Sequence, residues 1–517
     1  MSEKKQFALN FTAQILFNMV NLAINFFLVP KIIYSINATA YGFISISTDF
    51  VNYIGLLTVA LNSLAGRFIA INYHKKDYKK ANIYFNSALF ANLFIGILIA
   101  IGSIFFIVFL ERIINIPSDM IFDVKLLFTL VIANFLVGMT ASVFTTAAFI
   151  KNKLYLNSIV NIVTQVVRCV VLFSCYSFLP MNAWYMGLSA LLCACIYNIA
   201  NYVYFVKLTP ELKINIKLFN LKNAIELTKS GLWNVLTRLS STITNGLDLL
   251  IANLLVSSTA MGILALPRSI YSIILNLFSS LGGIFAPKTT MEAAKDNYAE
   301  MGEQMKFSYK FLGIISNTIL VVFMIFGGYF FQLWVPTQDA KLLHLIATVS
   351  CVDLIFALPM EPFYNVHTSL NKIKIPALML IIFSIVIITV EFIGLSMTDS
   401  LTMKLILISS TSSIIGIFRV LLFLPMYTAV LLKEKKTYFY PIIIKNSLAF
   451  IACIVVGLIF GQMVSVSGWF SFIIVCAVLA AVTLITTFYI NFNGEERKRA
   501  LRFITDRFKG KIKKITA

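Results

Sequence analysis

The chain has 517 residues, of which 59% are hydrophobic and only 12% are charged. A soluble globular domain carries about a quarter charged residues, so this composition excludes one and indicates an integral membrane protein. The formal net charge of +20 suits anionic lipid headgroups rather than nucleic acid, because the basic residues stand in short loops between long apolar runs.

Apolar runs long enough to cross a bilayer, which takes roughly 20 residues, recur about fourteen times. They are expected at 7–34, 41–71, 82–110, 122–150, 154–178, 184–207, 223–254, 258–288, 306–333, 340–368, 374–395, 402–431, 440–461 and 468–491. Every connection is short, and none carries a phosphate-binding loop, a zinc-protease motif or a nucleophile elbow. The sequence therefore predicts an all-α integral membrane protein that is a transporter, with no catalytic residue.

Lysine and arginine are concentrated in alternate connections. The basic set includes 75–80, 213–222, 433–436 and the C-terminal residues, whereas the connections between them are nearly uncharged. Because basic loops face the cytoplasm, we expect a multi-pass protein of the cell inner (cytoplasmic) membrane with both termini cytoplasmic. The seven cysteines and three histidines are scattered, so no metal site and no cofactor is expected, apart from H⁺ or Na⁺ coupling.

A short motif occurs twice, as TAYG at 39–42 and as TAMG at 259–262, an offset of 259 − 39 = 220 positions. The same offset matches a polar stripe in the first apolar run to one in the seventh. The matched residues are Gln14, Asn18, Asn21 and Asn25, opposite Asn234, Arg238, Ser241 and Asn245. This duplication predicts two pseudo-symmetric six-helix lobes around a central cavity, plus two extra C-terminal helices.

The duplication and the loop charges divide the chain into five expected segments. These are an N-lobe at 1–208, a cytoplasmic linker at 209–222, a C-lobe at 223–432, the extra helix pair at 433–492 and a basic tail at 493–517. The extra pair either packs against lipid or walls a groove for a long lipid tail. The apolar stripe and basic flanks of the tail are typical of an amphipathic helix on the cytoplasmic membrane surface.

Several charged residues stand inside the predicted spans, where an ionisable group is costly unless it faces a bundle interior or a wet cavity. Asp49 and Arg268 occupy nearly equivalent positions of the repeat, and we expect them either to face the cavity or to bridge the two lobes. Arg238 and Asp248 share one face of the seventh span. The full set expected to contact substrate is Asp49, Arg238, Asp248 and Arg268, with the neutral Asn18, Asn21, Asn25, Asn245 and Asn276.

The predicted span 340–368 contains Asp353 and Glu361 close to Pro359 and Pro362. Proline breaks a helix, and the freed carbonyl groups together with a carboxylate can bind Na⁺ or H⁺. Asp353 and Glu361 are therefore the candidates for ion coupling. The alternative is a kink with a hydrogen-bonded glutamate.

Two six-span lobes, two added spans and a repeated AxG motif followed by Asp or Arg resemble the multidrug/oligosaccharidyl-lipid/polysaccharide exporter superfamily, over about residues 8–490. The plan is similar to its polysaccharide-transport branch, the Wzx-type O-antigen and capsule repeat-unit flippases, and to the related lipid II flippases. The segment 265–271 (ALPRSIY), followed by Gly282 and Pro287, resembles the eighth helix of the lipid II flippases, and Thr48-Asp49 resembles their second. The resemblance implies that Arg268 contacts a substrate pyrophosphate. The first span departs from the lipid II flippases, because it carries asparagines where they carry arginines.

These features predict a flippase that moves a polyprenyl pyrophosphate-linked oligosaccharide from the inner to the outer leaflet by alternating access, for biosynthesis of a capsule or lipopolysaccharide. Arginine forks suit a phosphate anion, and asparagines can hydrogen-bond sugars. The expected partners are this lipid-linked glycan, anionic membrane lipids and a glycan polymerase or glycosyltransferases. Two alternatives stay open: a cation-coupled multidrug or metabolite exporter of the same superfamily, and a lipid II flippase.

Overall fold

The computed structural model describes residues 26–34, 36–151 and 153–498, together with Leu16, Met19, Val20 and Ile24. Within these residues every regular element is a helix, so the predicted all-α class is confirmed. The chain divides into two compact units. Unit 1 comprises Met1–Leu266 with Ala377–Ile385, and unit 2 comprises Pro267–Pro376 with Val386–Ala517.

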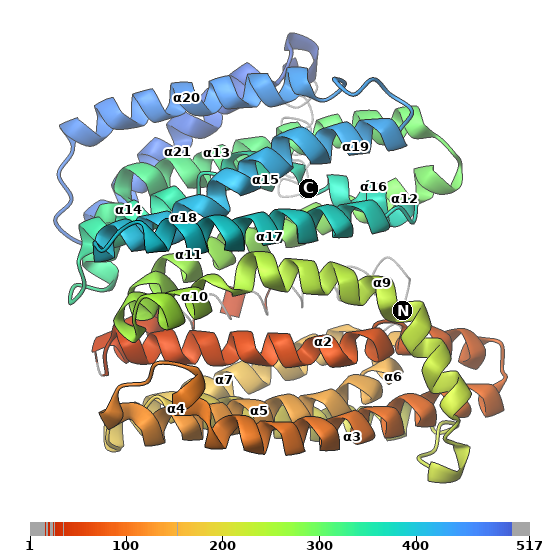
Figure 1. Cartoon of the computed structure of the whole chain (residues 1–517). Helices are drawn as coiled ribbons and strands as arrows, with labels where there is room; N and C mark the ends of the chain where they lie inside the picture. Colours follow the sequence, from red (N-terminus) through yellow and green to blue (C-terminus); the bar gives the residue numbers. More distant parts are fainter. Residues whose placement is uncertain are drawn as a thin grey trace, which may run out of the picture. The chain divides into compact units, whose positions relative to one another are not determined.

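Unit 1 is a bundle in which α2 packs against α3, α5 and α9, and α5 packs against α8 (Figure 1). Its elements are α2 (Ala38–His74), α3 (Tyr78–Val108), α4 (Leu110–Ile113), η1 (Ser118–Met120), α5 (Ile121–Phe144), α6 (Thr146–Ile150), α7 (Tyr155–Phe178), α8 (Trp184–Leu208), η2 (Ile216–Leu218), α9 (Leu221–Gly246), α10 (Asp248–Leu255) and the first part of α11 (Ser258–Gly283).

Unit 2 is built around α13, against which the predicted extra pair, α20 and α21, both pack. Its elements are the rest of α11, then α12 (Ala286–Ala294), α13 (Tyr298–Trp334), α14 (Ala340–Ser350), α15 (Leu354–Met360), α16 (Phe363–Ser369), the ends of α17 (Lys374–Ser396), α18 (Leu401–Phe418), the π-helix η3 (Arg419–Phe423), α19 (Leu424–Leu431), α20 (Tyr440–Met463) and α21 (Trp469–Asn491).

The sequence duplication extends to the geometry of the turns. The side chains of Asp77 and Asn297 cap α3 and α13 by accepting the backbone N–H three residues further on. Each cap follows a residue with positive φ, Lys76 at 61° and Asp296 at 54°. The two turns are 297 − 77 = 220 positions apart, the offset of the TAxG motif. The same turn therefore starts the second helix pair of each repeat.

The two copies of the TAxG motif contact each other in unit 1. A Cβ placed on Gly42 would lie 2.9 Å from the Cα of Gly262, and one placed on Gly262 would lie 2.6 Å from the carbonyl oxygen of Ala38. Backbone atoms cannot yield as a flexible side chain can, so both positions require glycine. The motif is thus explained by the close approach of the first turns of α2 and α11.

Eleven helical segments among the described residues are long and apolar enough to cross a membrane, and the bent pair α14–α15 makes up to twelve. Most of the predicted span 7–34 lies outside the described residues. The predicted span 223–254 is not one continuous helix, because it is broken at Leu247 between α9 and α10. The total of fourteen spans stays a prediction.

The segment expected to be a linker, 209–222, is held against α2 and α3. Glu211 accepts the hydroxyl hydrogen of Tyr73 at 2.6 Å, and this hydrogen bond lowers the pKa of Glu211. Asn82 Oδ1 accepts the backbone N–H of Lys213 at 2.7 Å. In the expected tail, the residues after 498 lie outside the described ones, so the amphipathic surface helix stays a prediction.

Candidate substrate and ion sites

The first candidate site lies where α9 packs along α2 in unit 1 (Figure 1). Arg238 is exposed on α9, and its Nη2 donates to Asn52 Oδ1 at 3.2 Å. Asn52 stands three residues after Asp49 on α2, so the two side chains are neighbours on the helix surface. Asp49 is only 8% exposed. This part of the structure therefore brings the predicted residue Arg238 to the turn of α2 that follows Asp49.

Small residues allow this approach. A Cβ placed on Gly231 would overlap the carbonyl oxygen of Ala60, so the backbones of α9 and α2 touch about two turns before Arg238. The guanidinium group is consequently carried on a helix whose position is set by backbone contact. A rigidly held cation of this kind is suited to bind an anion.

The other predicted substrate residues are found in both units. Asp248 is half-buried and starts α10, directly after the break at Leu247. On α11 of unit 2, Arg268 is half-buried and Asn276 is exposed. Asp49 and Arg268 belong to different units, and their pairing stays a prediction. Four of the predicted substrate contacts lie outside what is described, namely the residues Asn18, Asn21 and Asn25 and the side chain of Asn245.

The second candidate site occupies helix breaks within unit 2. Asp353 lies between α14 and α15, which meet at 49°, and it is 4% exposed. Its Oδ2 accepts the hydroxyl hydrogen of Tyr271 at 3.1 Å, and no hydrogen-bond partner of its Oδ1 is found among the described residues. Glu361 lies at the next break, between α15 and α16, where Pro359 and Pro362 predict one. That predicted break is confirmed.

Arg419 completes this cluster, although its sequence context indicates only an isolated charge. It starts the π-helix η3, and its Nη1 donates to the hydroxyl oxygen of Tyr364 at 3.0 Å. The guanidinium group interacts electrostatically with both Asp353 and Glu361. A short π-helix inside an α-helical span often marks a functional site. No local sequence pattern announces a π-turn, which is why this role of Arg419 was missed.

The charges of the cluster define what it can do chemically. The cluster contains one guanidinium group and two carboxylates, so these three groups carry one excess negative charge when both carboxylates are ionised. In a largely apolar unit such a charge is costly. A proton on either carboxylate, or a bound Na⁺, removes the excess. The cluster is therefore a candidate ion-coupling site, and Tyr271, Tyr364 and Arg419 join the two predicted acids.

Comparison with known proteins identifies the fold. No family model matches the chain. It is 24% identical over 506 residues to the uncharacterized membrane protein EpsK of Bacillus subtilis (strain 168), covering 96% of this chain and 98% of that one. An inward-facing MATE family multidrug resistance transporter of the MOP superfamily has a TM-score of 0.64 at 13% identity, over 80% of this chain and 99% of that chain. The lipid II flippase MurJ, in an inward closed conformation, has a TM-score of 0.63 at 14% identity, over 92% and 98%.

The chain thus has the fold of these solved transporters and of the lipid II flippase. It is a multi-pass membrane protein, and the solved structures that it matches move molecules across membranes. The two scores are nearly equal, so the fold does not choose between a drug exporter and a lipid flippase.

Proposed function

We propose that the chain is a flippase that moves a polyprenyl pyrophosphate-linked oligosaccharide from the inner to the outer leaflet of the bacterial cytoplasmic membrane, for surface polysaccharide biosynthesis. The observation that carries this proposal is Arg238, an exposed guanidinium group oriented by Asn52 on two packed helices of an apolar unit. Because the side chain is exposed, its guanidinium group is accessible to a ligand. Its forked donors match the oxygens of a pyrophosphate.

Polar groups near Arg238 suit the glycan. Asn52 and the half-buried Asn234 offer amide donors and acceptors on α2 and α9. Asn276 on α11 and the predicted Asn245 would extend this surface. The lobes would rock to expose the site first to the cytoplasm and then to the outside. A glycan polymerase and glycosyltransferases would be its partners in the pathway.

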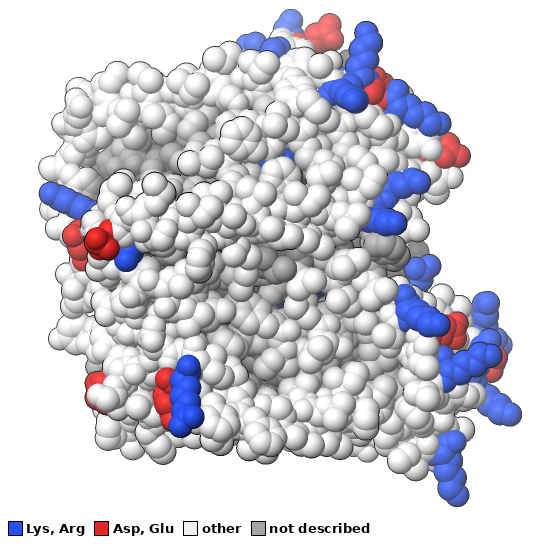
Figure 2. Space-filling view, viewed as in Figure 1, with Lys and Arg blue, Asp and Glu red and all other residues white. Residues whose placement is uncertain are grey.

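The proposed orientation puts both termini in the cytoplasm of the cell. Within each unit most lysines and arginines gather at one end of the helices (Figure 2). The positive-inside rule favours the cytoplasm for those ends, where anionic lipids would contact them.

Arg238→Ala tests the proposal directly. Loss of a charge-assisted contact costs about 1.5–3 kcal/mol, or roughly a tenfold to hundredfold loss of binding. We expect little lipid-linked glycan to reach the outer leaflet, with partial activity for Arg238→Lys. Lys229→Ala is the matched control, because it removes another exposed cation from α9. Normal export by Arg238→Ala, with an unchanged melting temperature in detergent, would exclude this role.

A second candidate function, a cation-coupled drug or metabolite exporter, is favoured by the acidic cluster around Asp353. It predicts that expression raises resistance to cationic drugs and that Asp353→Asn abolishes this effect. Under our proposal, drug resistance is unchanged and the accumulation of glycan in the outer leaflet depends on the protein. Rescue of a strain that lacks lipid II export would instead point to lipid II as the cargo.

A further inference from the structure

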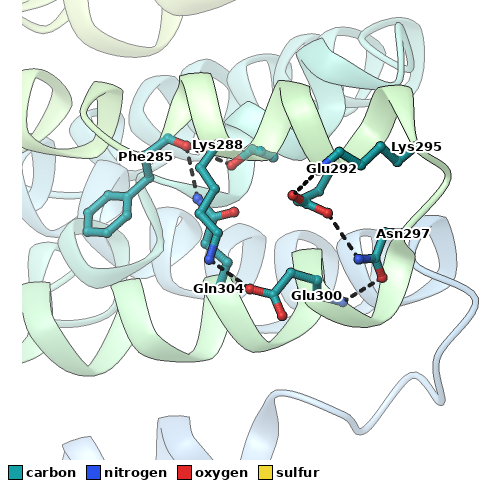
Figure 3. Close-up of polar contacts among 8 residues, drawn as sticks. Phe285, Lys288, Glu292, Lys295, Asn297, Glu300 and Gln304 are labelled. Atoms are coloured by element: carbon teal, nitrogen blue, oxygen red, sulfur yellow. Dashed lines mark hydrogen bonds and ion pairs between the residues drawn. The ribbon is translucent and has the colours of Figure 1, made fainter.

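A pocket of about 360 Å³ lies in unit 2, where α12 runs beside the start of α13 (Figure 3). Three apolar residues, Ile284, Phe285 and Phe307, form part of its wall. The rest is polar and consists of Lys288, Glu300, Glu303 and Gln304. None of these residues belongs to the two candidate sites described above.

The polar wall contains one weak ion pair. Lys288 Nζ donates to Glu300 Oε1 at 2.7 Å, and the two side chains are 53% and 45% exposed (Figure 3). An exposed pair of this kind contributes little to stability. A ligand that carries both a cation and an anion can replace this ion pair with two. Its cation would pair with Glu300, and its anion would pair with Lys288.

Gln304 supplies a second, independent sign of a ligand. It is 6% exposed, and its Nε2 donates to the carbonyl oxygen of Phe285 at 3.0 Å, which orients the amide (Figure 3). Its Oε1 is buried and has no hydrogen-bond partner among the described residues. A buried acceptor without a donor is costly. A ligand that donates a hydrogen bond to Gln304 Oε1, beside the carboxylates of Glu300 and Glu303, would satisfy this acceptor.

The pocket lies where the charged end of α13 meets its apolar part. All charged residues of α13 lie between Glu300 and Lys310, and the helix from Phe311 to Trp334 has none. The uncharged part is long enough to cross the hydrocarbon core, which takes about 20 residues. Phe307 and Ile284, at the rim, are 54% and 50% exposed. The polar wall is thus at the level of lipid headgroups.

We propose that this pocket binds the headgroup of an aminophospholipid, a primary ammonium beside a phosphate. The ammonium group donates to Gln304 Oε1 and to Glu300, the phosphate accepts from Lys288, and the acyl chains leave over Phe307. A choline headgroup has no N–H to give to Gln304. A glycerol headgroup brings a phosphate without a cation, so it leaves the carboxylate of Glu300 without a partner when Lys288 turns to the phosphate. The pocket should therefore prefer phosphatidylethanolamine to phosphatidylcholine and phosphatidylglycerol.

Native mass spectrometry of the full-length protein, released from nanodiscs with equal parts of these three lipids, tests the preference. We expect retention of phosphatidylethanolamine, reduced about tenfold or more in Lys288→Gln and in Gln304→Met. Lys295→Gln is the matched control. Lys295 is 59% exposed and pairs with Glu292 at 3.0 Å on the same helix–turn–helix, but it does not line the pocket (Figure 3). This variant should retain the lipid as the parent does.

Three results would overturn the proposal: equal retention of phosphatidylethanolamine and phosphatidylcholine, a preference for phosphatidylglycerol, or the same loss in Lys295→Gln as in Lys288→Gln. Because Gln304 is buried, Lys288→Gln decides the matter if Gln304→Met fails to fold. Glycerophosphoethanolamine carries the headgroup without the acyl chains and so tests recognition of the headgroup alone. It should displace the retained lipid at high concentration, and failure to do so contradicts recognition of the headgroup.

Discussion

At the scale of single residues, the two candidate sites differ in the sign of the charge that they hold. Asp353 is bonded to Tyr271 and lies within the field of Arg419, whereas Arg238 is bonded to the neutral Asn52. The first environment has an excess of negative charge and suits a cation. The second has an exposed donor fork and suits an anion. We therefore expect the substrate and the coupling ion to bind at different residues.

Asp353→Asn should uncouple transport from the ion gradient. The substitution keeps the shape of the side chain and removes the excess charge that a proton or Na⁺ would neutralise, so transport should no longer respond to pH or Na⁺ gradients. Tyr271→Phe is the control, because it removes the 3.1 Å hydrogen bond and leaves the carboxylate in place. Transport measured in proteoliposomes with imposed gradients distinguishes the two variants. If transport by Asp353→Asn responds to the gradients as transport by the parent protein does, Glu361 becomes the candidate coupling residue.

At the scale of elements, breaks and close contacts position the sites. The breaks on either side of α15 bring Asp353 and Glu361 to one guanidinium group. The contact between Gly42 and Gly262 holds the first turns of α2 and α11 together. Such contacts pack tightly because both helices have no side chain there.

Gly262→Ala should destabilise the protein, because the new Cβ meets the backbone of Ala38. Overpacking of this kind costs about 1–3 kcal/mol and lowers the melting temperature in detergent. Gly283→Ala is the matched control on the same helix, where a Cβ meets no atom within 4 Å. That substitution should leave stability unchanged or raise it by about 0.4–1 kcal/mol. Equal melting temperatures for the two variants would show that the close contact does not hold the helices.

At the scale of the whole molecule, the repeat and the distribution of charge determine the expected topology. The turns before α3 and α13 are the same turn at an offset of 220, and lysines cluster beside the first of them, at 75–80. We therefore expect each repeat to enter the membrane from the same side, which the positive-inside rule assigns to the cytoplasm.

Cysteine labelling in intact cells tests this topology, starting from a variant without the seven native cysteines. Lys79→Cys, in the exposed first turn of α3, should resist a membrane-impermeant maleimide. Met397→Cys should react, because Met397 is 80% exposed in a connection without lysine or arginine. After permeabilisation both should react. The opposite pattern in intact cells would reverse the orientation of the protein and the direction of export.

The sequence by itself determined the class of protein and the break at Pro359 and Pro362, because each depends on residues that are close together along the chain. Long apolar runs must span a membrane, and proline cannot continue the hydrogen bonding of a helix.

Only the tertiary structure decided the composition of the sites. The break at Asp353 has no glycine or proline to announce it, and the π-turn that carries Arg419 has no local signature. Tyr271 and Arg419 reach Asp353 from helices 82 and 66 positions away along the chain (353 − 271 and 419 − 353). The unpartnered oxygen of Gln304 likewise becomes visible only once α12 packs beside α13. Helical periodicity predicts which face a residue occupies, but packing alone determines what that face meets.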